Sequence, residues 1–194
     1  MSDKYHILVV DDELTSRKLI VGIFKKRGFQ ASQASSGKEC LELTESLEPD
    51  IIFLDVMMPG MDGFETCKKL KKNTKTMGIP VVFISGLEDK NDILKLYKAG
   101  GIDFIPKPID AQITVAKART TLENLELIKD KNNLLKINKL ILSKLNALFK
   151  EVALEEKIST SKEELHTSSS LLSELLEKLR SDLSKAIVTL DTIE

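Results

Sequence analysis

One stretch of the chain decides the fold, and it reads Pro49-Asp50-Ile51-Ile52-Phe53-Leu54-Asp55-Val56-Met57-Met58-Pro59-Gly60. Its apolar run, residues 51–54, shows no alternation of apolar and polar side chains, which is typical of a strand covered on both faces. The run ends on Asp55, and a Pro-Gly turn follows it. A carboxylate at the end of a buried strand must lie at the rim of the sheet, where water, a metal or a ligand can reach it. Asp55 is therefore a candidate reactive group.

Length and composition limit the classes of protein. The chain has 194 residues, of which 42% are hydrophobic and 30% charged, enough for one domain with an extension or for two small domains. The formal net charge of −1 argues against nucleic acid or a membrane surface as a partner. Cys40 and Cys67 belong to no metal or redox motif. No apolar stretch approaches the ~20 residues of a membrane span, so we expect a soluble, cytoplasmic protein.

Strand and helix patterns alternate through the first part of the chain. Strands are expected at residues 6–10, 29–34, 51–54, 79–84 and 102–105. Helices are expected from Thr15 or Ser16 to Gly28, from Ser36 to Pro49, over residues 64–72 and 89–99, and from a start near Asp110. This spacing favours βαβ units, so the sequence predicts a parallel sheet with helices on both faces.

Polar side chains follow four of the five expected strands. Asp11 and Asp12 come after the first strand, Asp55 after the third, Ser85 after the fourth and Lys107 after the fifth. The carboxyl ends of parallel strands meet at one edge of the sheet, which is where such folds bind ligands. We therefore expect these five residues to share one cleft.

The residue types in this cleft favour phosphoryl transfer. Three neighbouring carboxylates raise one another's pKa unless a cation lies between them. Mg²⁺ prefers oxygen ligands and keeps water that a phosphoryl oxygen can replace. Lys107 supplies positive charge to Asp55 or to the incoming group, and Ser85 supplies a hydroxyl donor. Because an aspartate can form an acyl phosphate, Asp55 is the expected nucleophile.

Residues 5–111 resemble the receiver domain of two-component response regulators. The resemblance covers a little over half of the chain and is carried by Asp11-Asp12-Glu13, by Asp55-Val56-Met57-Met58-Pro59-Gly60-Met61-Asp62-Gly63, by Ser85-Gly86 and by Asp103-Phe104-Ile105-Pro106-Lys107-Pro108. It implies a flavodoxin-like, doubly wound sheet of five parallel strands in the order 2-1-3-4-5.

The resemblance also implies a phosphoacceptor and its cofactor. Asp55 is expected to take a phosphoryl group from a histidine kinase or phosphotransfer protein. Mg²⁺ is expected to bind Asp11 or Asp12, together with Asp55 and the backbone carbonyl of Met57.

A Mg²⁺-dependent phosphatase would carry a second acid two residues after the nucleophile, and Met57 stands there instead. No enzymatic activity is therefore expected beyond the domain's own phosphorylation and dephosphorylation.

A switch follows from the same resemblance. Ser85 matches the family's switch hydroxyl, and Phe104 matches its switch aromatic residue. Phosphorylation is expected to draw Ser85 toward the phosphoryl group and to turn Phe104 inward, which reshapes the face formed by the fourth helix, fifth strand and fifth helix. The peptide bond between Lys107 and Pro108 is expected to be cis.

The rest of the chain reads as helix. All nine glycines and all five prolines fall before residue 109, and nothing between residues 112 and 158 stops a helix. Two apolar lanes recur every seven residues: Leu127, Leu134, Ile141 and Leu148, and beside them Ile128, Leu135, Leu142 and Phe149. Together the two rows form an apolar stripe that is wider than the contact surface of a two-stranded coiled coil, which favours a helical bundle. The expected domains are therefore residues 1–111, the long helix 112–158 and a second helical segment, 159–194.

The second segment begins with a break and a new helix start. Thr160 with Glu163, or Ser161 with Glu164, forms a capping box. A heptad pattern follows at Leu172, Leu176, Leu179, Leu183, Ala186, Leu190 and Ile193. We expect a homodimer, either from two helical hairpins that form a four-helix bundle or from one long parallel coiled coil, with the hairpin favoured. Such a helical output would act on an unidentified downstream protein and not on DNA.

Two alternatives stay open. His166 lies beside Glu163 and Glu164 at helical spacing, so the tail could carry a histidine phosphotransfer site, although the surrounding residues are atypical of such modules. Alternatively, the chain is the first part of a longer regulator, and its helices lead to an enzymatic output domain.

Overall fold

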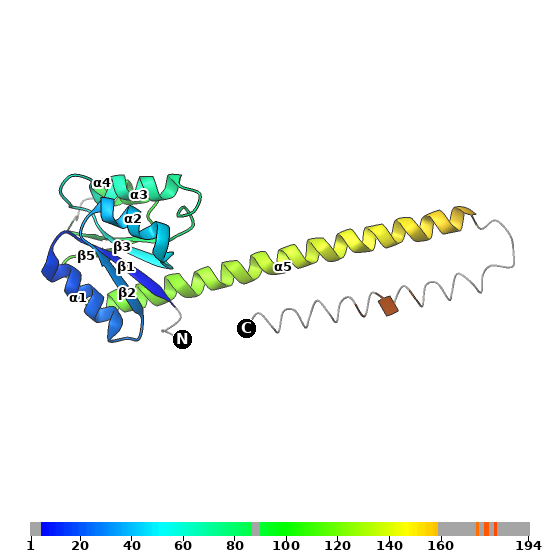
Figure 1. Ribbon diagram of the computed structural model, residues 1–194, viewed down its shortest axis with the longest axis horizontal. Helices are drawn as coiled ribbons and strands as arrows, with labels where there is room; N and C mark the ends of the chain where they lie inside the picture. Colours follow the sequence, from blue (N-terminus) through cyan, green and yellow to red (C-terminus); the bar gives the residue numbers. More distant parts are fainter. Residues whose placement is uncertain (1–4, 87–89, 159–173, 175–176, 179–180, 182–194) are drawn as a thin grey trace. The chain divides into compact units, whose positions relative to one another are not determined.

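A computed structural model describes residues 5–86 and 90–158 and, farther on, residues 174, 177, 178 and 181. The chain divides into two compact units, the first of which ends at Ile128. Figure 1 labels most of the strands and helices and colours them along the sequence. The strands are β1 (His6–Val10), β2 (Gln30–Ala34), β3 (Ile51–Asp55), β4 (Val81–Ser85) and β5 (Asp103–Pro106). The helices are α1 (Leu14–Lys25), α2 (Gly37–Leu47), α3 (Gly63–Lys72), α4 (Lys90–Lys98) and α5 (Ala111–Ile158).

The five strands form one parallel sheet in the order β2-β1-β3-β4-β5. This confirms the predicted flavodoxin-like fold and its strand order. The predicted strand ends differ from the observed ones by no more than two residues. For example, β4 begins at Val81 and not at residue 79, because Pro80 has no N–H to donate to a neighbouring strand.

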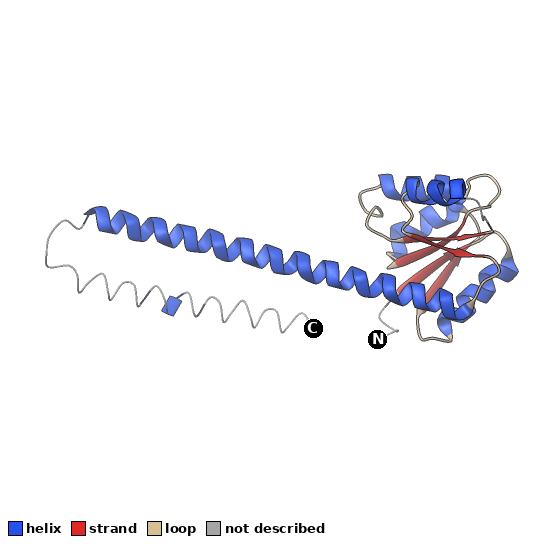
Figure 2. Cartoon of the chain, turned by 180° about the vertical axis from the view of Figure 1, so that it is seen from behind, coloured by secondary structure: helices blue, strands red, loops and turns tan. Residues whose placement is uncertain are grey.

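Helices cover both faces of the sheet, as Figure 2 shows from behind. On one face, residues of α2, α3 and α4 pack on Leu8, Val10, Ile52 and Leu54. On the other face, α1 and α5 pack on Ile7, Val9, Ile51 and Phe53. Every residue of the run 51–54 is fully buried, and burying such a side chain contributes roughly 1.5–3 kcal/mol. The absence of polar alternation in β1 and β3 is thus explained by two cores.

Short polar side chains fix most helix starts where the sequence predicts them. The Ser36 hydroxyl and the Asp62 carboxylate each accept a hydrogen bond from a backbone N–H in the first turn of α2 and α3. Asp110 does the same for α5. The predicted start of α1 at Thr15 or Ser16 is wrong, because the helix begins at Leu14. The Ser16 hydroxyl instead donates to the Asp11 carboxylate.

Helix α5 confirms the prediction of one long helix without a stop signal, running to Ile158. Its first part belongs to the domain: Val115, Ala118 and Leu122 are buried in the second core. Farther along, Glu126 hydrogen-bonds the Tyr5 hydroxyl, and burial together with this carboxylate raises the pKa of Tyr5 to about 12. The domain therefore holds α5 as far as its fourth turn or beyond.

Residues 129–150 of α5 carry large exposed apolar side chains, among them Leu134, Leu135, Leu140 and Leu142. None of the helices in the described part of the chain could span a membrane. The predicted capping box near Thr160 and the heptad pattern from Leu172 to Ile193 lie outside the part of the chain that the structure describes.

The start of α3 gives a test of this packing. A Cβ atom at Gly63 would lie 2.2 Å from the Asp55 carbonyl oxygen, whereas one at Gly22, within α1, would meet nothing within 4 Å. We expect Gly63→Ala to lower the free energy of unfolding by roughly 1–3 kcal/mol. Gly22→Ala should raise it by up to about 1 kcal/mol, because alanine is the better helix former. Urea unfolding followed by circular dichroism measures both. An unchanged midpoint for Gly63→Ala would contradict the close approach.

Candidate functional site

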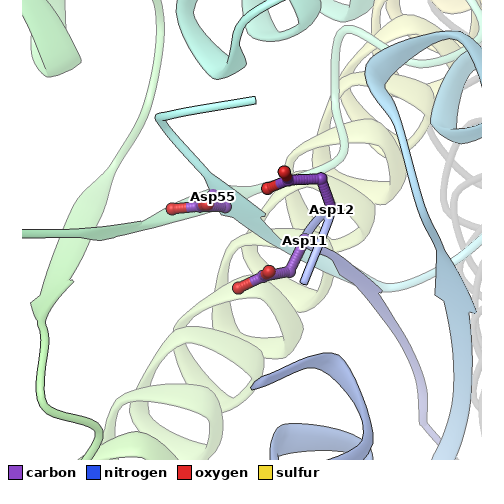
Figure 3. Close-up of side chains that lie close together, drawn as sticks. All are labelled: Asp11, Asp12 and Asp55. Atoms are coloured by element: carbon purple, nitrogen blue, oxygen red, sulfur yellow. The ribbon is translucent and has the colours of Figure 1, made fainter. Parts of the chain in front are cut away.

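Three carboxylates meet at the carboxyl end of the sheet (Figure 3). Strands β1 and β3 are neighbours, and the pairing of Val10 with Leu54 brings the next residues, Asp11 and Asp55, to adjacent strand ends. One carboxylate oxygen from each of Asp11, Asp12 and Asp55 lies within 4.8 Å of the other two. Asp11 and Asp55 are buried, whereas Asp12 is exposed. The cluster therefore has a closed inner side and an open outer side.

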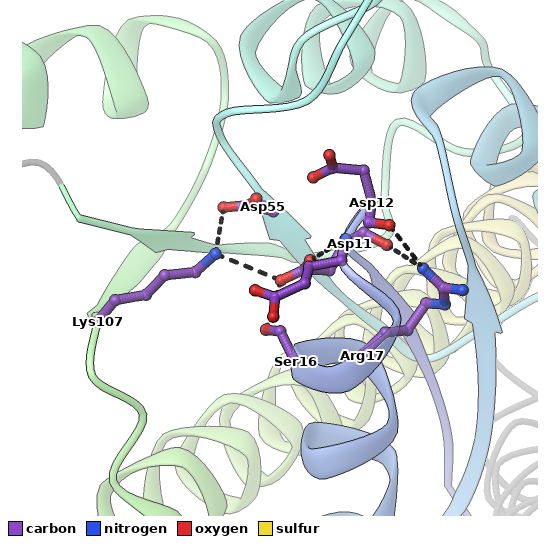
Figure 4. Close-up of polar contacts among 7 residues, drawn as sticks. Asp11, Asp12, Ser16, Arg17, Asp55 and Lys107 are labelled. Carbon is purple, nitrogen blue, oxygen red and sulfur yellow. Dashed lines mark hydrogen bonds and ion pairs between the residues drawn. The ribbon is translucent and has the colours of Figure 1, made fainter.

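Lys107 reaches this cluster from the end of β5 (Figure 4). Its Nζ lies 3.1 Å from Asp55 Oδ1 and 3.4 Å from Asp11 Oδ2. The backbone N–H of Lys107 donates to the carbonyl of Ser85 at 2.8 Å, which ties the end of β5 to the end of β4. The bond between Lys107 and Pro108 is cis, as predicted. One ammonium group thus bridges two of the three acids.

Burial decides the electrostatics of Asp55. Removal from water raises the pKa of its carboxyl group and outweighs the opposing effects of Lys107 and of a backbone N–H bond from Met57. For Lys107, burial acts against the charged form, but the carboxylates of Asp55 and Asp11 outweigh it and raise the pKa of the ammonium. Lys107 is therefore charged at neutral pH. Lys107 contacts two of the three acids and offsets only part of their charge, so the site favours a further cation.

The donor set fits a hard divalent cation. Its three side chains offer only carboxylate oxygens, which are the ligands that Mg²⁺ prefers. Two of these side chains come from rigid strand ends, and the exposed Asp12 leaves room for water on the outer side. The predicted contribution of the Met57 carbonyl stays a prediction; the Met57 side chain points away from the core and is 70% exposed.

Hydrogen bonds hold the loop Asp11-Asp12-Glu13 before α1, which is called the acidic loop below. Asp11 Oδ1 accepts the N–H of Glu13 at 2.8 Å, and Oδ2 accepts the Ser16 hydroxyl at 2.7 Å. Arg17 donates from Nη1 to the backbone carbonyl of Asp11 at 2.6 Å and approaches that of Asp12 at 3.3 Å. Ser16 and Arg17 were not among the predicted site residues.

A signal for Arg17 was nevertheless present in the sequence. It lies three residues before Ile20 and seven before Phe24, which places a charged residue on the buried face of α1. A buried charge in such a position needs a polar partner, and the acidic loop directly before the helix is the nearest source of one.

The two predicted switch residues lie in different surroundings. Ser85 is buried at the end of β4, one residue beyond Ile84, which pairs with Asp55. Phe104 is half-buried, pairs with Phe83 and packs against the core on the side of α2, α3 and α4. Ser85 therefore lies at the strand end next to Asp55, while Phe104 is part of the neighbouring core. His166 lies outside the described residues.

The buried carboxylate predicts a pH-dependent stability. The pKa of Asp55 in the folded chain exceeds the value of about 3.9 in the unfolded chain, so ionised Asp55 destabilises the fold at neutral pH. This destabilisation disappears as the pH falls through the folded and then the unfolded pKa. Without divalent cations, Asp55→Asn should raise the urea midpoint at pH 7 and lose much of that advantage near pH 4. A lower midpoint for the variant at pH 7 would contradict this account.

Comparison with known proteins identifies the domain that carries this site. The response regulator receiver domain matches residues 7–119. Response regulator PleD of Caulobacter vibrioides is 40% identical over 124 residues, which are 64% of this chain and 27% of PleD. The DNA-binding dual master transcriptional regulator RpaA of Synechocystis is 31% identical over 122 residues, or 63% of this chain and 51% of RpaA. The chain thus spans between about a quarter and a half of these relatives.

Solved structures agree with this assignment. The receiver domain of a signal transduction histidine kinase from Syntrophus aciditrophicus superposes with a TM-score of 0.58 at 30% identity, covering 62% of this chain and 91% of that one. NtrX from Brucella abortus gives a TM-score of 0.64 at 31% identity, covering 69% of this chain and 30% of NtrX. With the fold, the acidic cluster and its lysine in place, the chain belongs to the response regulator family, and residues 7–119 are its receiver domain.

Proposed function

We propose that this chain is a cytoplasmic signalling protein. Its Asp55 accepts a phosphoryl group from a histidine kinase or phosphotransfer protein, and this phosphorylation switches the protein between two states. Phosphorylation and Mg²⁺ binding are general for the receiver family. The observation that carries the proposal for this chain is the contact of buried Asp55 with Lys107 beside two further acids. These groups supply the nucleophile and the charges that phosphoryl transfer requires.

The transfer step uses few protein groups. An Asp55 carboxylate oxygen attacks the phosphorus of a phosphohistidine; the new P–O bond forms as the P–N bond breaks, and the imidazole leaves. Lys107 would neutralise charge on the transferred oxygens, and its position 3.1 Å from Asp55 Oδ1 supports this role. Asp11, Asp12 and Asp55, with the Met57 carbonyl, would hold Mg²⁺, which supplies further positive charge there. The domain speeds only its own phosphorylation and dephosphorylation.

The switch that follows involves Ser85 and Phe104. The Ser85 hydroxyl would donate to a phosphoryl oxygen on Asp55, because Ser85 lies at the adjoining strand end. Its movement would open space toward β5, into which Phe104 turns. The face formed by α4, β5 and α5 then changes shape, and α5 carries the change out of the domain. Met57 provides no second acid for hydrolysis, which favours a phosphoryl group held as a signal.

Phosphorylation at Asp55 is directly testable. Incubation of the full chain with acetyl phosphate and Mg²⁺ should add the mass of one phosphoryl group, and hydroxylamine should remove it because acyl phosphates react with hydroxylamine. Asp55→Asn should abolish the adduct. Asp50→Asn, at the opposite end of β3, is the matched control and should retain it. If intact-mass spectrometry shows the same yield of adduct in Asp55→Asn as in the wild-type chain, the proposal is wrong.

The output of the switch is proposed to be a helical dimer. Leu134, Leu135 and Leu142 in the long helix are 58%, 48% and 59% exposed. Leu135 and Leu142 lie two helical turns apart and so share one side of α5. A row of leucines in water favours association, since each buried leucine contributes roughly 1.5–3 kcal/mol. A second copy of the chain offers the same row, either in a hairpin bundle or in a coiled coil, and the assembled helices would bind a downstream protein.

Charge placed on this row should dissociate the dimer. We expect the wild-type chain to have the mass of a dimer by multi-angle light scattering, and Leu135→Asp with Leu142→Asp to have the mass of a monomer. Lys136→Asp with Ser143→Asp introduces the same side chains one position onward, outside the apolar band, and should remain dimeric. A monomeric wild type, or a dimeric leucine variant, would contradict the proposed output.

A second candidate is a longer regulator. Its basis is the partial coverage of the relatives, since this chain matches only 27% of PleD and 51% of RpaA. In that case α5 would lead to a further output domain, and the receiver would still work through Asp55.

A further inference from the structure

We propose that Arg17 is the positioning residue of the divalent-cation site: it holds the loop that carries Asp11 and Asp12 so that their carboxylates face Asp55. This inference rests on the cation site proposed above. It assigns a role to a residue that neither supplies a ligand atom nor touches the phosphoacceptor.

The contacts of Arg17 point to this role. The side chain is only 9% exposed and comes from the first turn of α1, behind the acidic loop (Figure 4). Nη1 lies 2.6 Å from the Asp11 carbonyl oxygen and 3.3 Å from that of Asp12. One donor group thus contacts the backbone of both acids. The two carbonyls point toward Arg17, whereas the carboxylates of Asp11 and Asp12 lie near that of Asp55, where the cation would bind.

The choice of carbonyls as partners has a chemical consequence. An arginine that paired with the carboxylates would compete with a cation for the same oxygens. Arg17 instead binds the backbone carbonyls, so it does not occupy the carboxylate oxygens of Asp11 and Asp12. Of these oxygens, Asp11 Oδ2 is contacted by Lys107 and by the Ser16 hydroxyl. The guanidinium therefore orders the site without occupying it.

Burial of the guanidinium indicates that this contact matters. Arg17 shares the inner face of α1 with Ile20 and Phe24, where an apolar residue would avoid the cost of burying a charge. Glu39 at the start of α2 is the acid whose pKa the Arg17 charge helps to lower, after larger contributions from the Ser35 hydroxyl and N–H. Glu39 is thus engaged mainly by Ser35, and the hydrogen bonds that Arg17 makes go to the acidic loop.

Positioning and simple electrostatics predict opposite results. If Arg17 acted only through its charge, its removal would leave a more negative site and tighten cation binding. If it positions the acids, removal lets the loop relax and weakens binding, although the net charge has become more favourable. Losing an outer contact of this kind typically weakens metal binding by about 10–100-fold.

The experiment measures Mn²⁺ binding to the full, unphosphorylated chain by electron paramagnetic resonance, which reports free Mn²⁺. We expect Arg17→Gln to raise the dissociation constant by about tenfold or more. Lys18→Gln removes the same charge from the next, exposed position and should change it less than twofold or tighten it. Arg17→Lys keeps the charge but loses the planar fork, and should fall between wild type and Arg17→Gln.

The outcomes separate this inference from the proposed function. Wild-type binding that is lost in Asp55→Asn but equal or tighter in Arg17→Gln would overturn the positioning role and leave the cation site standing. A wild-type chain that binds no Mn²⁺ would overturn both. Circular dichroism without metal establishes that each variant is folded. If Arg17→Gln does not fold, Arg17→Lys decides: affinity equal to wild type would overturn the inference, and a several-fold loss would support it.

Discussion

The structure depends on one electrostatic constraint: two buried carboxylates, Asp11 and Asp55, end neighbouring strands and share a single ammonium group. Burial raises the pKa of Asp55, and Lys107 offsets only part of that effect. The uncompensated negative charge makes the strand ends a place where a cation can bind favourably. A protein with such a site is more stable when a cation occupies the site than when it is empty. Binding there can therefore shift the equilibrium between two conformations.

The fold supplies this constraint through its topology. Parallel pairing of β1 with β3 sets the two acids side by side, and β4 and β5 bring Ser85 and Lys107 to the same edge. Two cores, one on each face, pack against the strands, and tightly packed interiors tend to switch between discrete arrangements rather than deform gradually. Helix α5 is part of the second core and continues beyond the domain. Under the proposed function, α5 is the route by which the state of Asp55 leaves the receiver.

Much of this arrangement could be predicted from the sequence, for identifiable reasons. Apolar runs such as Ile51–Leu54 marked buried strands, and each reactive residue lay within two residues of the end of a run, so the shared edge followed from parallel pairing alone. Contacts across a turn were harder to predict. Thr15 or Ser16 was expected to begin α1, yet the helix begins at Leu14 and the Ser16 hydroxyl donates to the buried Asp11 carboxylate. The role of Arg17 depends on which way two carbonyls point, and residue types do not determine that. How far α5 belongs to the domain also depended on packing, through Leu122 and Glu126.

The central claim is that Asp55, Lys107 and the two neighbouring acids form one phosphoryl-binding unit. A crystal structure of the chain grown with Mg²⁺ and beryllofluoride, which imitates an acyl phosphate, tests it most directly. The account predicts the beryllofluoride bonded to Asp55, with Lys107 Nζ and Ser85 Oγ each within hydrogen-bond distance of a fluorine and the cation among Asp11, Asp12 and Asp55. Beryllofluoride absent from Asp55, or a cation bound away from these acids, would contradict it.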